Sequence, residues 1–223
     1  EELAKRLNLP IQYANNRQEL DNIFSQHSFS SRLGIVVDYG VIISEQVIKS
    51  FELGIVNSHF SLLPQWRGAD PITFSILSGQ EKTGVSLMVI DQYLDTGKLI
   101  IQKELDINHD ETVISLTHRL IRLSNDLLLD YIPAYFDGQI SLFEQPNQNL
   151  ATYSRKISKE DGFIDSTKPA EQIERQIRAF LGWPGSKIAH KGKNIIIKKA
   201  HVADKAETKL DIPCSDGKYL SID

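Results

Sequence analysis

The chain has 223 residues, a size that fits one large domain or one domain with a smaller module. Hydrophobic residues make up 41% and charged residues 24%, which is ordinary globular usage and excludes a disordered chain, a collagen-like repeat and a small disulfide scaffold. The longest apolar runs, such as 127–129 and 195–197, are too short to cross a bilayer. The single cysteine, Cys214, cannot form an internal disulfide, and the first residues are charged, so we expect a cytoplasmic protein.

The net charge of −4 disfavours a protein coated in nucleic acid, but the charge is unevenly distributed. Between Trp183 and Lys209, seven lysines stand against two acidic residues, so this segment carries +5. A basic segment on an acidic body suits the binding of a polyanion in one region. From charge alone, however, a solvated lysine-rich hairpin is the favoured interpretation.

The first half of the chain alternates short β-rich runs with helical patterns. We expect helices over 2–7, 17–27, 44–51, 70–77 and 111–135, and strands over 11–13, 33–38, 54–59, 84–90 and 99–107. Ser44 is a candidate N-cap, and Pro71 suits the first turn of its helix. The continuous apolar run 33–38 predicts a strand buried on both faces. Strand–helix alternation predicts parallel pairing and a three-layer α/β domain.

Polar residues dominate 145–166, after which the pattern changes. One helix is expected over 170–181, followed by short β runs at 187–190, 194–202, 209–213 and 218–222. This pattern is typical of a small β-barrel. We therefore expect a first domain over residues 1–145, a linker over 146–169 and a C-terminal module over 170–223. The chain does not begin with methionine and its last residues resemble an interrupted strand, so we expect a fragment.

The densest group of polar residues spans 57–68. Asn57 and His59 are two positions apart at the end of a predicted strand, which puts both side chains on one face. Ligands of open α/β sheets bind at the carboxyl ends of strands. An amide there can stabilise an oxyanion while an imidazole moves a proton. An isolated Asn-x-His more often only satisfies loop carbonyls.

A second polar group, 91–97, follows the predicted strand 84–90. Asp95 could orient His59 and raise its basicity, although Asp and Gly are also common turn residues. We expect Asn57, His59 and Asp95 to converge at one cleft. The sequence contains no glycine-rich phosphate-binding motif, and its six histidines show no metal-ligand spacing, so we expect no metal site.

Two long motifs carry a family resemblance: NSHFSLLPQWRGADP at 57–71 and IDQYLDTG at 90–97. Together they resemble the signature of the folate-dependent formyltransferases. DYGVIIS at 38–44 resembles the folate-binding strand end of that family. KISKEDGFID at 156–165 and IRAFLGWPGS at 177–186 resemble the linker and C-terminal module of the branch that acts on initiator tRNA.

The resemblance implies a Rossmann-like domain with a mostly parallel sheet, followed by an incomplete OB-like β-barrel. It implies transfer of a formyl group from 10-formyltetrahydrofolate to the α-amino group of methionine on initiator tRNA, in the cytoplasm and without a metal. Asn57, His59 and Asp95 match the catalytic trio, and Arg67 matches a positioning residue. The matching folate-pocket residues are Tyr39, Gly40, Val41, Ile42, Ile43, Ser61, Leu62, Leu63, Pro64, Asp91 and Leu94.

Three further expectations follow from the resemblance. The Leu63–Pro64 peptide should be cis. Asp38 stands where the tRNA-acting enzymes usually have a small residue, so it puts a charge near the pterin pocket or lies on its rim. The N-terminal strands of the family, with their glycine-rich turn, are absent and the barrel stops early.

Three rival functions remain open. A sugar-nucleotide N-formyltransferase would use the same trio, and a 10-formyltetrahydrofolate hydrolase would use water as the acceptor. A non-catalytic RNA-binding protein could keep the fold, but it would not need the trio. The basic C-terminal module favours tRNA, because a small sugar acceptor needs no extended basic surface.

Overall fold

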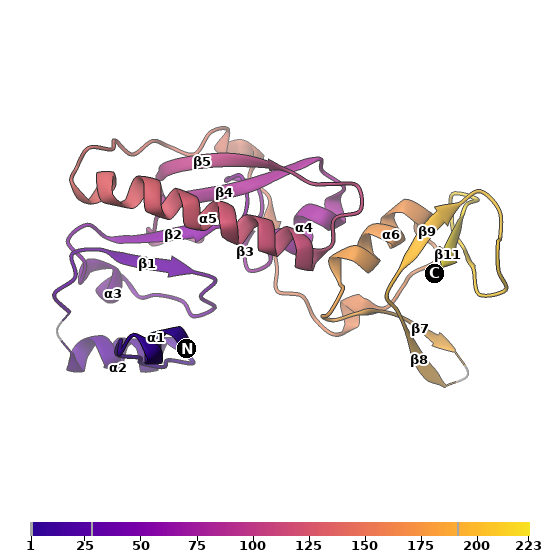
Figure 1. Ribbon diagram of the computed structural model, residues 1–223, viewed down its shortest axis with the longest axis horizontal. Coiled ribbons are helices and arrows are strands. Elements are labelled where there is room, and N and C mark those ends of the chain that lie inside the picture. The colour runs from indigo at the N-terminus through magenta and orange to yellow at the C-terminus, as the bar shows by residue number, and fades with distance from the viewer. Residues whose placement is uncertain (1, 28, 191) are drawn as a thin grey trace.

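The computed structural model describes residues 2–27, 29–190 and 192–223. Its elements form a larger sheet-containing half and a smaller C-terminal module, as Figure 1 shows. Among the described residues, no helix combines the length and apolar character needed to span a membrane.

A four-stranded sheet organises the first half. It consists of β1 (Gly34–Val37), β2 (Ile55–His59), β4 (Lys82–Val89) and β5 (Leu99–Asp106), in the order β1-β2-β4-β5. The α/β class is confirmed, but a mostly parallel sheet is not what the described strands form. Only β1 and β2 pair in parallel, whereas β4 runs antiparallel to both of its neighbours. The short connection between β4 and β5 forces antiparallel pairing, because parallel neighbours need a long crossover.

The helices lie close to their predicted ranges. They are α1 (Glu2–Arg6), α2 (Arg17–Gln26), α3 (Glu45–Lys49), α4 (Pro71–Ser78) and α5 (Val113–Phe136). The Ser44 hydroxyl accepts a hydrogen bond from the Val47 N–H, which confirms Ser44 as the cap of α3. The strand expected over 11–13 does not form.

Helix α5 covers one face of the sheet (Figure 1). Val56 on β2 and Val85 and Leu87 on β4 pack in one buried cluster with Leu116 and Leu120 of the helix. The apolar spacing of α5 and the alternation of the strands therefore meet in one core.

The other face of β4 packs against the turn that follows β2. Leu63 from this turn is buried with Met88 and Leu99 in a second cluster. The turn is thus fixed to the sheet rather than free in solvent.

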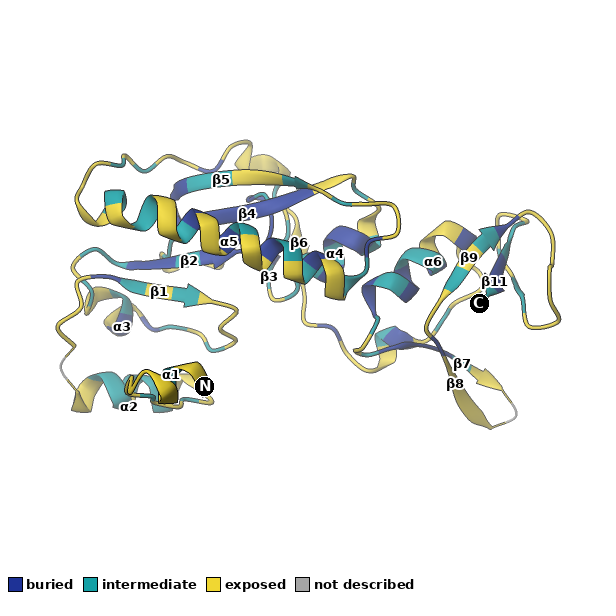
Figure 2. Cartoon of the chain, viewed as in Figure 1, coloured by how far each residue is buried: buried dark blue, intermediate teal, exposed yellow. Residues whose placement is uncertain are grey.

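Strand β1 departs from the prediction of burial on both faces. Ile35 and Val37 are exposed, and Figure 2 shows the strand alternating in burial along its length. Strand β1 lies at one edge of the described sheet, with β2 as its neighbour. An apolar run alone does not reveal that position.

The segment that leads to the C-terminal module first pairs with the first half of the chain. Strand β6 (Tyr153–Ser154) pairs in parallel with β3 (Arg67–Gly68), and the 3₁₀ turns Gln148–Leu150 and Glu160–Gly162 flank it. Helix α6 (Ala170–Ala179) then joins the halves, because Ile173 and Ile177 pack in the module while Phe180, just after the helix, packs in the core beneath α5. The segment 146–169, which we expected to be a linker, is therefore hydrogen-bonded to the first half through β6.

The described strands of the module pair with one another antiparallel. Strands β7 (Ser186–His190) and β8 (Lys193–Ile197) form a hairpin, and β9 (Ala200–Ala203), β10 (Ile212–Pro213) and β11 (Tyr219–Ile222) form a sheet in the order β10-β11-β9. The predicted strand 194–202 is divided at Lys198 and Lys199. The described strands form two separate sheets and do not close into a barrel.

Replacing Leu120 by alanine should destabilise the first half by about 2–5 kcal/mol, because the side chain is fully buried between α5 and the sheet. Thermal or denaturant unfolding measures this loss. The neighbouring Ile121 is about half exposed, so Ile121→Ala is the matched control and should change the free energy of unfolding by less than about 0.5 kcal/mol. Equal effects of both changes would contradict the burial of this face.

Candidate active site

Strand β2 divides its side chains between two environments. Val56 packs in the core beneath α5, and the Ser58 hydroxyl lies 2.7 Å from that of Ser124 on the same helix. Because neighbouring strand residues point to opposite faces, Asn57 and His59 share the face turned away from α5. This is the face on which the turn after β2 packs.

His59 is buried and is fixed by the backbone of this turn. Its Nε2 lies 2.9 Å from the carbonyl oxygen of Trp66. Since a carbonyl can only accept, Nε2 carries a proton and donates it. In the neutral ring the free lone pair is therefore on Nδ1, which faces the Asp95 carboxylate at 3.8 Å.

Asp95 is held by the same stretch of backbone. Its Oδ2, the atom nearest to His59, accepts a 2.7 Å hydrogen bond from the Gly68 N–H. Trp66 and Asp95 both adopt positive φ angles, 53° and 52°. Such values are unusual for a bulky residue such as tryptophan and mark backbone strain of the kind found at functional sites. These backbone conformations direct the Trp66 carbonyl and the Asp95 carboxylate at the His59 imidazole.

Asp95 reaches His59 by a route that the sequence did not predict. His59 pairs with Ser86, and Val56 pairs with Val89, so β4 ends about three residues, or ~10 Å, away from the level of His59. The loop after β4 must double back across the sheet. At Gly97 a Cβ would lie 1.8 Å from the Val89 carbonyl oxygen, so only glycine permits this close return.

Burial lowers the pKa of His59, because the charged imidazolium would lose its hydration. The Asp95 carboxylate and the hydrogen bond to Trp66 oppose this shift without cancelling it. The ring is therefore neutral at physiological pH and can accept a proton at Nδ1. The imidazolium formed in that way would be stabilised by the adjacent carboxylate.

Asn57 and His59 differ in exposure. Asn57 is half-buried, whereas His59 is only 5% exposed. Asn57 is therefore partly open to solvent, whereas the His59 side chain is almost entirely enclosed by protein. Truncating His59 would leave a cavity and would leave the Trp66 carbonyl with only the long 3.4 Å hydrogen bond from the Ser154 hydroxyl, so His59→Gln is the better probe of its chemistry.

The residues predicted to bind folate lie in three segments around β2. Residues 39–43 follow β1, which pairs with one edge of β2, and Asp91 and Leu94 lie in the loop after β4, which pairs with the other edge. Tyr39, Ile42 and Leu94 are exposed. Asp91 organises its loop by accepting hydrogen bonds from the Tyr93 N–H and the Thr96 hydroxyl.

The third segment predicted to bind folate, residues 61–64, is mostly buried. Ser61, Leu63 and Pro64 are buried, and Leu62 is half-buried against Gly84. The Ser61 hydroxyl donates to the Gln65 carbonyl oxygen. The Leu63–Pro64 peptide is cis, as expected, and Trp183–Pro184 is a second cis peptide.

Two further sequence expectations concern charged residues. Asp38 is exposed, consistent with a position on a rim, and has a positive φ of 49°. Arg67 is buried, and its guanidinium donates a 2.6 Å hydrogen bond to the Gln145 side chain. Gln145 is not among the predicted site residues. It lies far along the sequence from Arg67, in a polar stretch that resembles a linker.

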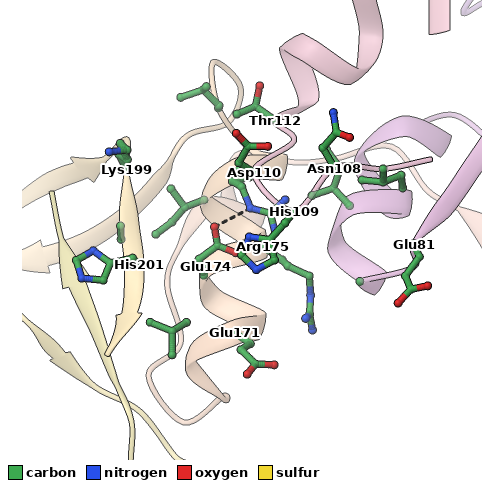
Figure 3. Close-up of a pocket in the computed structure, with 18 of the residues that line it drawn as sticks. Glu81, Asn108, His109, Asp110, Thr112, Glu171, Glu174, Arg175, Lys199 and His201 are labelled. Atoms are coloured by element: carbon green, nitrogen blue, oxygen red, sulfur yellow. Dashed lines mark hydrogen bonds and ion pairs between the residues drawn. The ribbon is translucent and has the colours of Figure 1, made fainter. Parts of the chain in front are cut away.

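A separate groove of about 1380 Å³ lies where the two halves of the chain meet. Figure 3 shows Glu81 and Asn108 from the first half on one side of α6, and Lys199 and His201 from the module on the other. None of its lining residues belongs to the trio. Gln80 on its wall nevertheless accepts a hydrogen bond from the Trp66 indole, whose backbone carbonyl binds His59.

Sequence comparison identifies the family to which this fold belongs. The family described as "Formyl transferase" matches residues 4–132, and "Formyl transferase, C-terminal domain" matches residues 156–223. The chain belongs to the formyltransferase family. It is 43% identical over 156 residues to the methionyl-tRNA formyltransferase of Halorhodospira halophila, covering 70% of this chain and 50% of the relative. It is 36% identical over 222 residues to that of Pseudoalteromonas translucida, covering 100% of this chain and 68% of the relative.

Solved structures support the same architecture. A 4-N formyltransferase from Francisella tularensis matches with a TM-score of 0.70 at 20% identity, covering 88% of this chain and 80% of the other. An N-formyltransferase from Helicobacter canadensis, solved with folinic acid and dTDP-3-aminofucose, matches with a TM-score of 0.64 at 23% identity, covering 82% and 72%. At these identities the likeness shows the fold alone.

Replacing Asp95 by asparagine should lower the pKa of His59 further, because the carboxylate is the main influence that opposes burial. NMR titration of the His59 ring measures the shift. Asp91→Asn is the control, since Asp91 binds its own loop rather than His59. A His59 pKa that is unchanged or raised in Asp95→Asn would contradict the pairing.

Proposed function

We propose that the protein transfers a formyl group from 10-formyltetrahydrofolate to the α-amino group of methionine on initiator tRNA, in the cytoplasm. The observation that carries the proposal is the pairing of buried His59 with partly buried Asp95, with Asn57 on the same face of β2 as His59. The printed names of the relatives supply the acceptor.

The three side chains have complementary roles in this reaction. Bound 10-formyltetrahydrofolate supplies the formyl group. The amide of Asn57 donates to the formyl oxygen as it gains negative charge during attack by the amine. Nδ1 of His59 accepts the proton that the amine loses and returns it to the folate nitrogen as the bond from that nitrogen to the formyl carbon breaks. Asp95 stabilises the imidazolium between these two transfers.

The surroundings of the trio suit a folate. Tyr39 and Ile42 after β1 and Leu94 after β4 are exposed apolar residues in the segments that flank β2. A flat pterin ring could cover such side chains, and the backbone N–H and C=O groups of these loops could bind its polar edge. We propose these residues, with Gly40, Val41, Ile43 and Asp91, as the folate contacts. Ser61, Leu62, Leu63 and Pro64 would support the pocket.

The tRNA would contact the module, but not through every lysine of the basic segment. Lys187 is buried, donates to the Lys159 carbonyl oxygen and lies over the Phe163 ring, so it is structural. Lys191 lies outside the described residues. Lys193 is exposed on the hairpin, and Lys198 and Lys199 line the groove between the halves. These three are the proposed phosphate contacts.

One assay separates this proposal from its rivals. The intact protein is incubated with 10-formyltetrahydrofolate and, in parallel, with charged initiator tRNA, charged elongator tRNA, an amino-sugar nucleotide or no acceptor. Formyl incorporation into initiator methionyl-tRNA supports the proposal. Preference for the amino sugar, formate release without an acceptor, or no turnover at all would each overturn it.

In the same assay Asn57→Ala should reduce kcat by about 10²- to 10³-fold, because it removes the proposed oxyanion donor. Asn57 is half-buried, so the fold should survive. Asn125→Ala, on the exposed side of α5, is the matched control and should keep wild-type turnover. Wild-type activity in Asn57→Ala would remove Asn57 from the catalytic set.

Replacing Lys193 and Lys198 by alanine should weaken tRNA binding and reduce its salt dependence, because each lost phosphate contact lowers the slope of log K against log salt by about 0.9. Filter binding or fluorescence at several salt concentrations measures both. The charge-matched control replaces the exposed Lys49 and Arg122 of the first half. Equal losses of tRNA affinity in the two double variants would mean that only the net charge of the protein matters.

A further inference from the structure

Gln145 occupies an unusual position for a residue in a polar connecting segment. Its side chain is only 3% exposed and lies between Arg67 and the loop that carries Asp95. Its amide oxygen accepts from the Arg67 guanidinium at 2.6 Å. Its amide nitrogen donates to the carbonyl oxygens of Asp95 at 2.8 Å and Gly97 at 3.0 Å.

These contacts close a cycle around the proposed catalytic carboxylate. Gly68, the neighbour of Arg67, donates its N–H to the Asp95 side chain, while Gln145 links the Arg67 side chain to the Asp95 backbone. Asp95 is therefore held at its side chain by Gly68 and at its backbone by Gln145, which is itself bound to Arg67 of the same strand, β3. Since Asp95 has a strained left-handed backbone, its conformation depends on such external restraints.

Only an amide satisfies all three bonds of Gln145. A carboxylate could accept from Arg67 but could not donate to two carbonyl oxygens, and an ammonium could donate but not accept. Among the described residues, no carboxylate lies within 4.0 Å of the Arg67 guanidinium, and its Nε has no hydrogen-bond partner. Arg67 therefore depends on Gln145 for its side-chain hydrogen bond.

We propose that Gln145, supported by Arg67, is a positioning residue that sets the distance between Asp95 and His59. This rests on the proposed function for its catalytic consequence, but not for its effect on His59. Gln145 contacts neither imidazole nor carboxylate, so its influence must pass through the backbone of Asp95.

The test is a double-mutant cycle with two readouts in the intact protein. The variants are Gln145→Met, Asp95→Asn and their combination, with Gln148→Met as the control because Gln148 is exposed in the same loop. Gln145→Met should lower kcat for formyl transfer by up to about 100-fold, with KM for both substrates nearly unchanged, because misplacement by about 1 Å costs that much. It should also lower the His59 pKa measured by NMR, in the same direction as Asp95→Asn.

The combination decides the route of action. If Gln145 acts through Asp95, Gln145→Met adds nothing to Asp95→Asn in either readout. The proposal would be overturned in favour of a structural role if the double variant lost kcat by the product of the two single losses. An unchanged His59 pKa in Gln145→Met would overturn it as well. Should the wild-type protein lack formyl transfer, the proposed function fails while the NMR titration still decides this inference.

A second variant guards against misfolding. Gln145→Glu keeps an acceptor for Arg67 but removes both bonds to the loop, so the fold should persist while kcat and the geometry at His59 are impaired. Wild-type kcat in Gln145→Glu would show that the bonds to Asp95 and Gly97 are dispensable.

Discussion

The hydrogen bond between the His59 ring and the Trp66 carbonyl is the contact on which the site depends. It requires a left-handed backbone at Trp66, and that conformation is supported by the packing of the turn beneath it. Ser86 of β4 donates to the Ser61 carbonyl oxygen and accepts from the Leu63 N–H, so the sheet directly braces the turn. The strain at one residue is thus offset by satisfied buried polar groups elsewhere.

Burial determines the protonation state of the His59 ring in this contact. A histidine in water would be partly protonated near neutral pH, whereas burial lowers the pKa of His59 and keeps the ring neutral. With the proton fixed on Nε2, the free acceptor Nδ1 faces Asp95. The 3.8 Å separation lets the carboxylate act as a charge without holding a proton by a direct hydrogen bond.

Local patterns predicted most elements and placed Asn57 and His59 on one face of a strand, because periodicity and capping chemistry are encoded within a few residues. Ser44 and the apolar spacing of α5 are examples. Properties that depend on distant partners were missed: the exposure of Ile35 follows from its place at a sheet edge, and the burial of Lys187 follows from its contacts with Lys159 and Phe163. Gln145 gave no local signal, since its bonds reach residues 48–78 positions away.

The segment between the two halves is part of the site rather than a tether. The Trp66 N–H donates to the Thr152 hydroxyl, the Arg67 N–H to the Thr152 carbonyl oxygen and the Ala69 N–H to the Ser154 carbonyl oxygen. The strip of backbone that positions His59 and Asp95 is therefore itself positioned by residues beyond the expected domain boundary at 145. Because the same segment leads into α6, whose Arg178 donates to the Glu111 carbonyl oxygen of the first half, a displacement of the module would strain the backbone around the imidazole.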